Sequence, residues 1–376
     1  MKPETENDLA EVIAAASGPL AVKGGGTRGI APQGDVLDVS GIRGVSLYEP
    51  GALTLVAAAG TPVADVEAAL AAEHQRLAFE PMDHRGLMGT SGAPTIGGVI
   101  AGNISGPRRI QGGAARDFAL GVRFVDGAGN IVKNGGRVMK NVTGYDLVKL
   151  MAGSWGTLGV LTEVALKVLP TPETQATLVL QGLNEVDAVR AMAAALGSPF
   201  EVSGASHLPE GPDGGPTTML RVEGFEASVA YRLTQLQMLL SGFGARVERA
   251  DAASTVRIWA DVRDVAAFHG IAGDVWRVSC KPSDGPALAA RAQAQGCVFD
   301  WAGGLIWLRV SEGTDLRSRL GAFDGHATLV RGTAETRAKV PVFQPEASGV
   351  AKLTAGLRAR FDPRGILNPG LMGSAA

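Results

Sequence analysis

The sequence predicts an α+β protein built from two main domains. A chain of 376 residues is longer than one hydrophobic core usually supports, so we expect it to divide. Residues 89–170 are dense in glycine yet contain strand-like runs rich in β-branched residues, which a flexible linker would lack. From Thr171 to about Val340, strand-like and helical segments alternate with short links. That alternation is typical of an α+β domain.

Composition and charge exclude several classes of protein. The net charge is −2 and basic residues are not clustered, so the chain has no electrostatic footprint for nucleic acid. Cys280 and Cys297 fit reduced thiols better than a disulfide framework. The first residues are polar and acidic, and no run of about 18 apolar residues occurs. We therefore expect a cytoplasmic protein that attaches to the inner face of the cell membrane, if at all, only through partners.

A glycine loop near the N-terminus is the first candidate binding element. Apolar spacing predicts a helix over 4–16, and strands are expected at 20–23 and 36–39. The loop Gly24–Gly29 between these strands formally matches the GxGxxG pattern of dinucleotide-binding folds, but Pro32 and Gly34 break any helix after it. We therefore reject a Rossmann fold. Successive backbone N–H groups in such a loop can still bind a pyrophosphate, the alternative being a simple turn.

Turn signals define further elements. Leu53–Ala59 is an apolar run that predicts a strand, followed by a turn at Gly60. Thr61 is expected to cap a helix whose first residue is Pro62. Asp126–Asn130 separates two strand-like runs, which predicts a hairpin.

The glycine-dense stretch carries several motifs that together resemble a known family. They are Thr95–Gly98 (TIGG), Asn103 with Ser105 and Gly106, Lys140–Asp146 (KNVTGYD), and Gly153–Val160 (GSWGTLGV). This arrangement resembles the FAD-binding domain named for p-cresol methylhydroxylase (the PCMH type), shared by the vanillyl-alcohol oxidase superfamily. The order of GPRR, VMKNVTGYDL and GTLGVLTE is similar to that in the smaller FAD-binding subunits, the E subunits, of bacterial glycolate oxidases. The likeness covers the first half of the chain best, the C-terminal tail fairly and the middle weakly.

The resemblance implies a domain layout. Residues 1–170 would form a PCMH-type FAD-binding domain of two subdomains. Residues 171–340, which we call the cap, would form an α+β domain resembling a ferredoxin-like sheet. Residues 341–376 would form a helix and a tail that return to the FAD-binding domain.

The resemblance also implies FAD as the cofactor. Relatives that attach FAD covalently do so through a histidine in the N-terminal glycine loop, where this chain has Thr27, so noncovalent FAD is expected. Main-chain N–H groups would meet its phosphates. The residues implied in FAD binding are Gly24, Gly25, Gly26, Thr27, Gly60, Thr95, Ile96, Gly97, Gly98, Asn103, Ser105, Gly106, Gly153, Ser154, Gly156, Thr157, Gly159 and Val160.

Oxidation of a 2-hydroxy acid by a flavin needs a base for the hydroxyl proton and a cation for the carboxylate. The first candidates are His326 and Arg331, in the GHATLVRG segment of an expected cap strand. His84 and Arg85, in the connector 81–89 that lies near the flavin ring in relatives, form a second pair. A lone histidine in a strand is more often structural. The histidines are scattered without ligand spacing, so no metal is expected.

The functional hypothesis that follows is an FAD-binding subunit of a glycolate oxidase complex. It would oxidise glycolate to glyoxylate and pass electrons to a second FAD subunit and an iron–sulfur subunit. One alternative is a stand-alone FAD-dependent oxidase of a 2-hydroxy acid or an alditol. Another is a structural subunit that binds FAD and performs no redox step.

Overall fold

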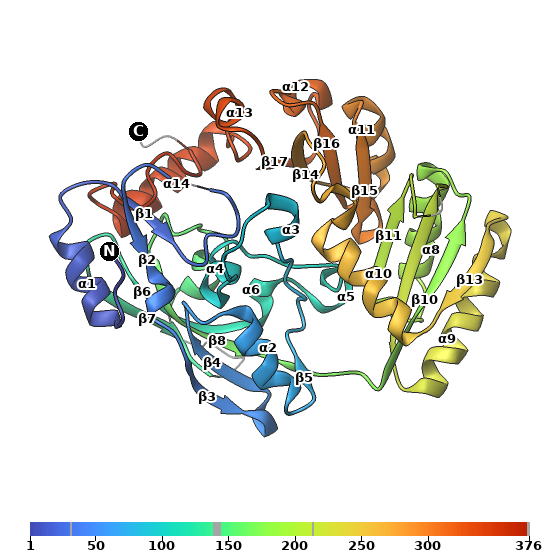
Figure 1. The fold of residues 1–376 in the computed structure, drawn as a ribbon, viewed down its shortest axis with the longest axis horizontal. Coiled ribbons are helices and arrows are strands. Elements are labelled where there is room, and N and C mark those ends of the chain that lie inside the picture. The colour runs from blue at the N-terminus through green and yellow to red at the C-terminus, as the bar shows by residue number, and fades with distance from the viewer. Residues whose placement is uncertain (31, 138–143, 213, 374–376) are drawn as a thin grey trace.

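The computed structural model describes residues 1–30, 32–137, 144–212 and 214–373 (Figure 1). Two groups of strands and helices lie side by side in Figure 1. One contains the elements up to β9 together with the C-terminal helix α14 (Ser348–Phe361), and the other surrounds an eight-stranded sheet formed by the cap.

The N-terminal elements confirm the predicted helix and strands. Helix α1 (Glu6–Ala15) begins with a capping box, in which Thr5 accepts from the backbone N–H of Asp8 and the Asp8 carboxylate accepts from that of Thr5. Strand β1 (Leu20–Lys23) pairs in parallel with β2 (Asp35–Asp38). The described part of the glycine loop between them contains no helix, in keeping with the rejection of a Rossmann fold.

An antiparallel five-stranded sheet forms the core of the first half of the chain. Its order is β3 (Val45–Glu49), β4 (Thr54–Ala58), β8 (Val160–Lys167), β6 (Ala119–Val125), β7 (Ile131–Gly135). The predicted hairpin is confirmed, because β6 and β7 pair up to Val125 and Ile131 on either side of the turn. The shorter elements are η1 (Val39–Gly41), η2 (Pro50–Ala52), α2 (Val63–Ala71), β5 (Gln75–Arg76) paired with β9 (Leu169–Pro170), α3 (Arg85–Met88), α4 (Ile96–Ala101), α5 (Arg109–Gly112), α6 (Ala115–Phe118) and α7 (Leu147–Met151).

The prediction that Thr61 caps helix α2 is wrong. Pro62 occupies the N-cap position and makes no side-chain cap. The Thr61 hydroxyl instead donates to the carbonyl of Ala58 at 2.7 Å and accepts from the N–H of Gly44 at 2.9 Å. The hydroxyl therefore stabilises the turn between β4 and the helix rather than the helix itself.

The cap contains one continuous antiparallel sheet of eight strands. Its order is β13 (Arg246–Ala250), β10 (Thr174–Gln181), β12 (Thr217–Gly224), β11 (Gly204–Leu208), β15 (Gly296–Asp300), β16 (Leu305–Val310), β14 (Asp274–Cys280), β17 (Gly325–Arg331). The helical elements are α8 (Glu185–Leu196), α9 (Glu226–Leu239), η3 (Ser241–Phe243), α10 (Ala252–Asp264), η4 (Ala266–Phe268), η5 (Pro282–Asp284), α11 (Gly285–Ala292), η6 (Trp301–Gly303), α12 (Leu316–Leu320) and, after the sheet, α13 (Ala334–Lys339).

The strand order of the cap contains a ferredoxin-like arrangement twice. Strands β10 to β13 with α8 and α9 follow the order βαββαβ, and strands β14 to β17 with α11 and α12 repeat it. The two units join where β11 pairs with β15, at His207 and Phe299. Sequence reasoning expected one such sheet; the structure has two, merged because each unit offers an edge strand to the other.

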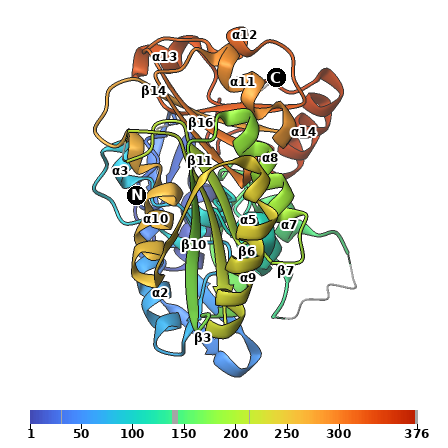
Figure 2. The same cartoon turned by 90° about the vertical axis from the view of Figure 1, so that its right-hand side faces the viewer.

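Helices cover both faces of the first cap unit. Leu178 and Leu220 point toward α8 and α9, whereas Val179 and Met219 pack on the other face with Trp259 of α10. Figure 2 shows α9 and α10 on opposite sides of β10. The sheet is therefore buried on both faces at this end.

The C-terminal segment extends the small β1–β2 pair. The N–H of Leu20 donates to the carbonyl of Ile366 at 2.7 Å, and the N–H of Asn368 donates to the carbonyl of Leu20 at 3.0 Å. The Asn368 side chain accepts from the N–H of Val22 at 2.7 Å and donates to the carbonyl of Trp155 at 2.8 Å. One residue near the end of the chain thus fixes the start of the glycine loop against residues 155–156.

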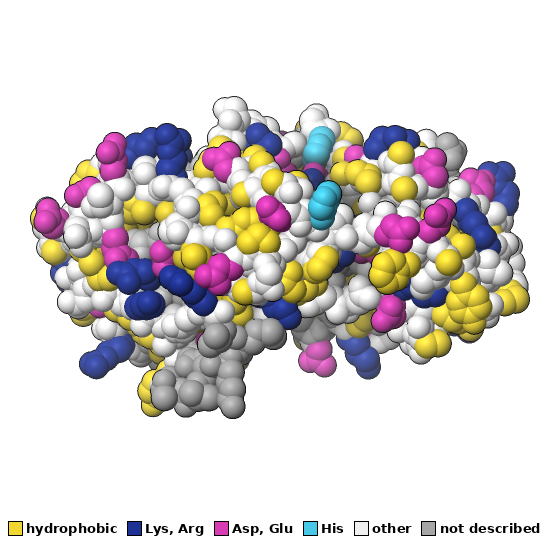
Figure 3. Space-filling model, turned by 90° about the horizontal axis from the view of Figure 1, so that it is seen from below, with side chains coloured by type: hydrophobic (Ala, Val, Ile, Leu, Met, Phe, Trp, Pro, Cys, Tyr) yellow, Lys and Arg dark blue, Asp and Glu magenta, His cyan; other side chains and the backbone are white. Residues whose placement is uncertain are grey.

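On the face seen from below, acidic and basic side chains of the described residues are interspersed (Figure 3). Among the residues that the structure describes, no helix is long and apolar enough to cross a membrane.

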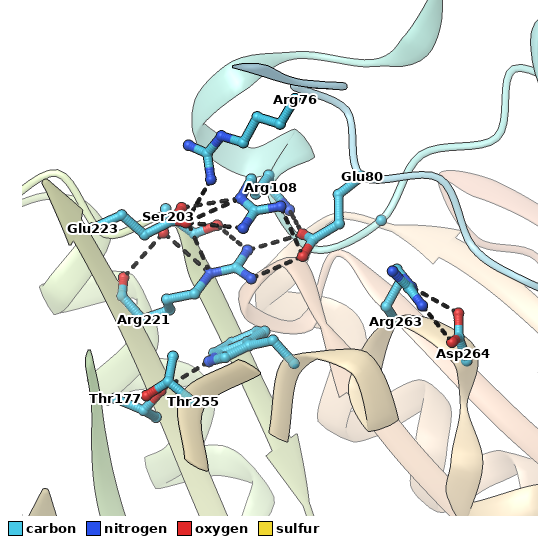
Figure 4. Close-up of polar contacts among 12 residues, drawn as sticks. Arg76, Glu80, Arg108, Thr177, Ser203, Arg221, Glu223, Thr255, Arg263 and Asp264 are labelled. Carbon is cyan, nitrogen blue, oxygen red and sulfur yellow. Dashed lines mark hydrogen bonds and ion pairs between the residues drawn. The ribbon is translucent and has the colours of Figure 1, made fainter. Parts of the chain in front are cut away.

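A buried group of charges connects the cap to the first half of the chain (Figure 4). The Arg221 guanidinium on β12 donates to both oxygens of Glu80, each at 2.9 Å. Arg108 lies 2.9 Å from Glu80 and donates to both oxygens of Glu223, while Arg76 donates to Glu223 at 2.7 Å. The Arg221 side chain is only 1% exposed. Its charge is therefore compensated by the acids rather than by water.

Replacing Arg221 with methionine is expected to lower the free energy of unfolding by about 3–5 kcal/mol, because Glu80 would keep a buried charge without its bidentate partner. Burial alone would raise the pKa of Glu80, but Arg221 and Arg108 hold it below its ordinary value. Its contribution is therefore present at neutral pH and lost as pH falls through that lowered pKa. Urea unfolding at several pH values measures both effects. The exposed Arg190→Met is the control, and equal stability of the two variants would contradict the prediction.

Candidate active site

A first cavity is lined by the glycine loop and by glycines from two other segments. Its walls are Val22, Lys23, Gly24, Gly25, Gly26, Thr27, Arg28, Gly29, Ile30, Pro32, Val39, Ala59, Gly97, Gly98, Ala101, Trp155, Gly156, Gly159, Val160, Leu161, Asn368 and Leu371. Side chains are excluded at several of these positions. A Cβ on Gly25 would lie 1.6 Å from the carbonyl oxygen of Ala93, and Gly26 and Gly156 have φ of +67° and +71°. At its glycine positions the wall is therefore main chain.

A second, larger cavity of about 540 Å³ adjoins the first. Arg28, Ile30 and Trp155 line both. Its walls come from the connector around His84, residues 102–116, cap strands β14, β16 and β17, and the C-terminal residues 342–346. This cavity therefore lies where the cap, the glycine-dense stretch and the C-terminal segment meet.

Two histidines line the larger cavity. His84 is buried, and its Nδ1 lies 3.3 Å from the carbonyl oxygen of Met82. Burial first, and then the charge of Arg28, lower the pKa of His84 to about 3. His326 on β17 is exposed in the cavity. Its pKa is also lowered, by desolvation first and then by Arg277 and Arg109. Both imidazoles are thus neutral at neutral pH, but a pKa of about 3 makes His84 a weak base.

Two arginines in the same cavity flank one tryptophan. The guanidinium carbon of Arg109 lies 4.4 Å from the ring centroid of Trp301, and that of Arg277 on β14 lies 5.0 Å from it. Neither guanidinium has an ion pair or hydrogen bond to any residue that the structure describes. Burial and then Arg109 lower the pKa of Arg277 to about 10, so both arginines stay charged. Asp300 does not cancel them fully, because burial raises its pKa to about 7.

This pair of unpaired cations was missed by sequence reasoning. Arg277 stands in a strand-like run, VWRVSC, in which a single arginine between apolar residues was the available signal. Arg109 is part of the GPRR motif. Nothing local in the sequence shows that these two distant segments place their arginines against the same tryptophan ring.

Comparison with known proteins adds the family. Residues 1–135 match the model of a family described as FAD binding domain. The chain is 34% identical over 359 residues to the protein of Escherichia coli (strain K12) called glycolate oxidase subunit GlcE, an alignment that covers 94% of this chain and 92% of that protein. The chain belongs to the GlcE family of glycolate oxidase subunits.

Solved structures match the fold of this chain. A structure of p-cresol methylhydroxylase with substrate bound matches with a TM-score of 0.72 at 14% identity, covering 100% of this chain and 88% of that one. An alkyldihydroxyacetonephosphate synthase matches with a TM-score of 0.72 at 16% identity, covering 98% and 76%. This GlcE-family chain is thus an FAD-binding flavoprotein of the FAD-linked oxidoreductases, with a mixed α+β fold that matches theirs over nearly its full length.

Two features of the first cavity suit the pyrophosphate of FAD. Its loop offers backbone amides where side chains have no room, as binding of a pyrophosphate requires. Nε and Nη2 of Arg28 are buried without a hydrogen-bond partner among the described residues, so an anion at this place would find a donor. FAD supplies two phosphates, and the matching family is described as FAD binding domain.

The FAD-binding residues expected from the sequence divide into three groups in this GlcE-family chain. Those that line the first cavity are Gly24, Gly25, Gly26, Thr27, Gly97, Gly98, Gly156, Gly159 and Val160. Those that line the larger cavity are Asn103, Ser105 and Gly153. Those that line neither are Gly60, Thr95, Ile96, Gly106, Ser154 and Thr157.

The third group supports the walls instead of forming them. Thr95 caps α4, where its hydroxyl accepts from the N–H of Gly98 at 3.3 Å. A Cβ on Gly60 would lie 2.3 Å from the carbonyl oxygen of Val39. A Cβ on Gly106 would lie 2.2 Å from that of Glu80. These positions require small residues or a cap because other parts of the protein pack against them.

Arg331 and Arg85 lie outside both cavities, contrary to their expected role as cations for substrate. The Arg331 guanidinium donates to the carbonyls of Gly273, Leu87, Phe268 and Ile271 at 2.6–3.1 Å. Arg85 pairs with Asp83 at 2.7 Å. Their donors are used within the protein.

Arg331→Met is therefore expected to reduce thermal stability by several degrees while leaving the KM for substrate unchanged, because carbonyl groups rather than a ligand lose their donors. Thermal unfolding and steady-state kinetics measure the two effects. A raised KM with unchanged stability would return Arg331 to the substrate site.

Part of one motif cannot be placed. Residues 140–143 of KNVTGYD lie outside the described residues. Within the described ranges, no group of three or more histidine, cysteine, aspartate or glutamate residues could hold a metal ion. Cys280 and Cys297 are free thiols.

Proposed function

We propose that this chain is an FAD-loaded subunit of a glycolate oxidase complex and that it oxidises glycolate to glyoxylate itself. The observation that carries the proposal is the pair Arg277 and Arg109, which line the larger cavity and have no ion-pair partner among the described residues. Two guanidinium groups suit a carboxylate. His84 and His326 in the same cavity supply candidate bases.

Each residue would have a separate task. Bound FAD supplies the acceptor for the two electrons that leave the substrate carbon. Arg277 and Arg109 would bind the carboxylate and orient the hydroxyl-bearing carbon. His326 would take the hydroxyl proton on an imidazole kept neutral by its surroundings. Trp307, Leu329 and the other apolar lining residues would limit water.

The pH dependence follows from the lowered pKa of His326. If this imidazole is the base, kcat/KM for glycolate should be flat above about pH 6.5, the ordinary value for histidine, and fall as pH drops through the lowered pKa. His326→Gln should abolish this fall in kcat/KM at low pH, the acid limb of the profile, and reduce kcat by about 10²–10⁴. If His84→Gln rather than His326→Gln abolishes the limb, the base is His84.

We also propose that FAD is bound without a covalent bond and that the domains divide after residues 170 and 340. The first is supported by the absence of histidine from Gly24–Gly29, and acid precipitation should release the flavin. The division after residue 170 is supported by the end of β9 at Pro170 and the start of β10 at Thr174, and that after residue 340 by the end of α13 at Lys339.

Electrons would pass to a second FAD subunit and an iron–sulfur subunit. Any membrane attachment of this otherwise cytoplasmic chain would be peripheral and through those partners.

The test uses the purified FAD-loaded chain with an artificial electron acceptor. Glycolate should yield glyoxylate, whereas ethylene glycol, which has no carboxylate for Arg277 and Arg109, should react at least about 100-fold more slowly, as expected when two charged hydrogen bonds are lost. Equal rates with the two substrates would favour an alditol oxidase. If neither substrate reacts with the chain alone and dithionite does not reduce its flavin either, the chain serves as a non-catalytic FAD-binding subunit.

A further inference from the structure

Arg28 is a half-buried arginine whose Nε and Nη2 have no partner among the described residues. It lies within the glycine loop Gly24–Gly29, and its side chain forms part of the wall of both cavities. Its Nε and Nη2 are buried and have no hydrogen-bond partner, and no carboxylate lies within 4.0 Å of it among the residues that the structure describes. Burial lowers its pKa to about 10, so it remains charged at neutral pH.

A charge in this position calls for an anion. Burying an unpaired charge is costly, and folded proteins normally pair or neutralise such a group. The first cavity fits FAD, which carries two sources of negative charge: the pyrophosphate, and the pyrimidine edge of the flavin ring when the ring is reduced. The glycine loop already offers main-chain donors to the phosphates.

The surroundings of the Arg28 guanidinium favour the flavin ring over the pyrophosphate as its partner. Its Nη1 lies 2.9 Å from the point that a Cβ on Gly98 would occupy, at the inner wall of the first cavity. Its charge acts on His84 and is in turn affected by Asp83. Both residues belong to the connector 81–89, and His84 lines the larger cavity. The guanidinium therefore faces the cavity in which substrate and ring would meet.

We propose that Arg28 is a cofactor-binding residue that compensates the negative charge gained by the flavin ring on two-electron reduction. A fixed cation stabilises charge that develops beside it without reorganising. Arg28 should thus bind reduced FAD more tightly than oxidised FAD and raise the reduction potential. The inference rests on FAD binding and is independent of which substrate is oxidised.

The experiment measures the midpoint potential of the FAD-loaded full chain. Each protein is reduced anaerobically with dithionite in the presence of a redox dye of known potential. The proteins compared are wild type, Arg28→Met, Arg28→Lys and the surface control Arg190→Met. Arg28→Met should bind reduced relative to oxidised FAD at least tenfold less tightly, which for a two-electron couple lowers the midpoint by about 30 mV. Arg28→Lys should recover most of the loss, and Arg190→Met should match wild type.

The remaining outcomes contradict the proposal. An unchanged midpoint overturns it. If oxidised and reduced FAD both bind more weakly by the same factor, or folded Arg28→Met holds no FAD, the partner is the pyrophosphate and the assignment to the ring is wrong. Thermal unfolding of the FAD-free chain separates a structural role: removing an unpaired charge should leave stability equal or higher, whereas a clear loss would make Arg28 a structural residue.

Discussion

Gly98→Val is expected to weaken FAD binding by at least about 100-fold, or about 2.8 kcal/mol. A Cβ at this position would lie 2.9 Å from Nη1 of Arg28 and 3.1 Å from Oγ1 of Thr95, and the further methyl groups would enter the first cavity. Fluorescence titration of the FAD-free variant with FAD gives the dissociation constant.

The matched control is Gly356→Val. Gly356 also lies in a helix, α14, but has nothing within 4 Å of an added Cβ. Valine there should leave FAD affinity unchanged, because Gly356 lines neither cavity and valine is a better helix former than glycine. If Gly98→Val keeps stoichiometric FAD with normal affinity, the cavity between the glycine segments is not the FAD site.

Arg277→Met is expected to lower kcat/KM for glycolate by about 100-fold, because a charged hydrogen bond to the carboxylate is worth about 1.5–3 kcal/mol. FAD content should stay unchanged, since Arg277 does not line the first cavity. Steady-state kinetics of the FAD-loaded variant, with the flavin spectrum as a check of loading, measure the effect.

Arg309→Met controls for the loss of a cap arginine. Arg309 lies on the adjacent strand β16 and donates to the carbonyls of Ala272 and Gln295, outside the larger cavity. Its removal should leave the KM for glycolate at the wild-type value. If Arg277→Met has normal kinetics, the carboxylate is bound elsewhere and the proposed orientation of substrate is wrong.

The glycine walls of the first cavity could largely be predicted from the sequence, because runs of glycine are a local sequence signal. Glycines are required where a ligand or another backbone approaches closely. The loop Gly24–Gly29 and the pair Gly97–Gly98 can therefore be recognised from their glycine content alone. The same signal is ambiguous, however. Gly60 and Gly106 are small because protein packs on them, and only the fold separates these two reasons.

The substrate side of the site could not be predicted in the same way. Arg277 and Arg331 are both arginines in apolar strands of the cap, yet one is free in the cavity and the other is bonded to carbonyls. The difference depends on strand register and on which loops lie at the sheet edge, which are tertiary properties. The same holds for Glu80 and Arg221, whose pairing joins segments 141 residues apart.

The central claim is that this chain itself oxidises glycolate, and the visible spectrum of the purified FAD-loaded chain during anaerobic addition of glycolate tests it most directly. Loss of the oxidised-flavin bands, with one glyoxylate formed per flavin, is the predicted result. Bands that persist with glycolate but disappear with dithionite would contradict the claim. The chain would then hold a reducible flavin that receives its electrons from another subunit.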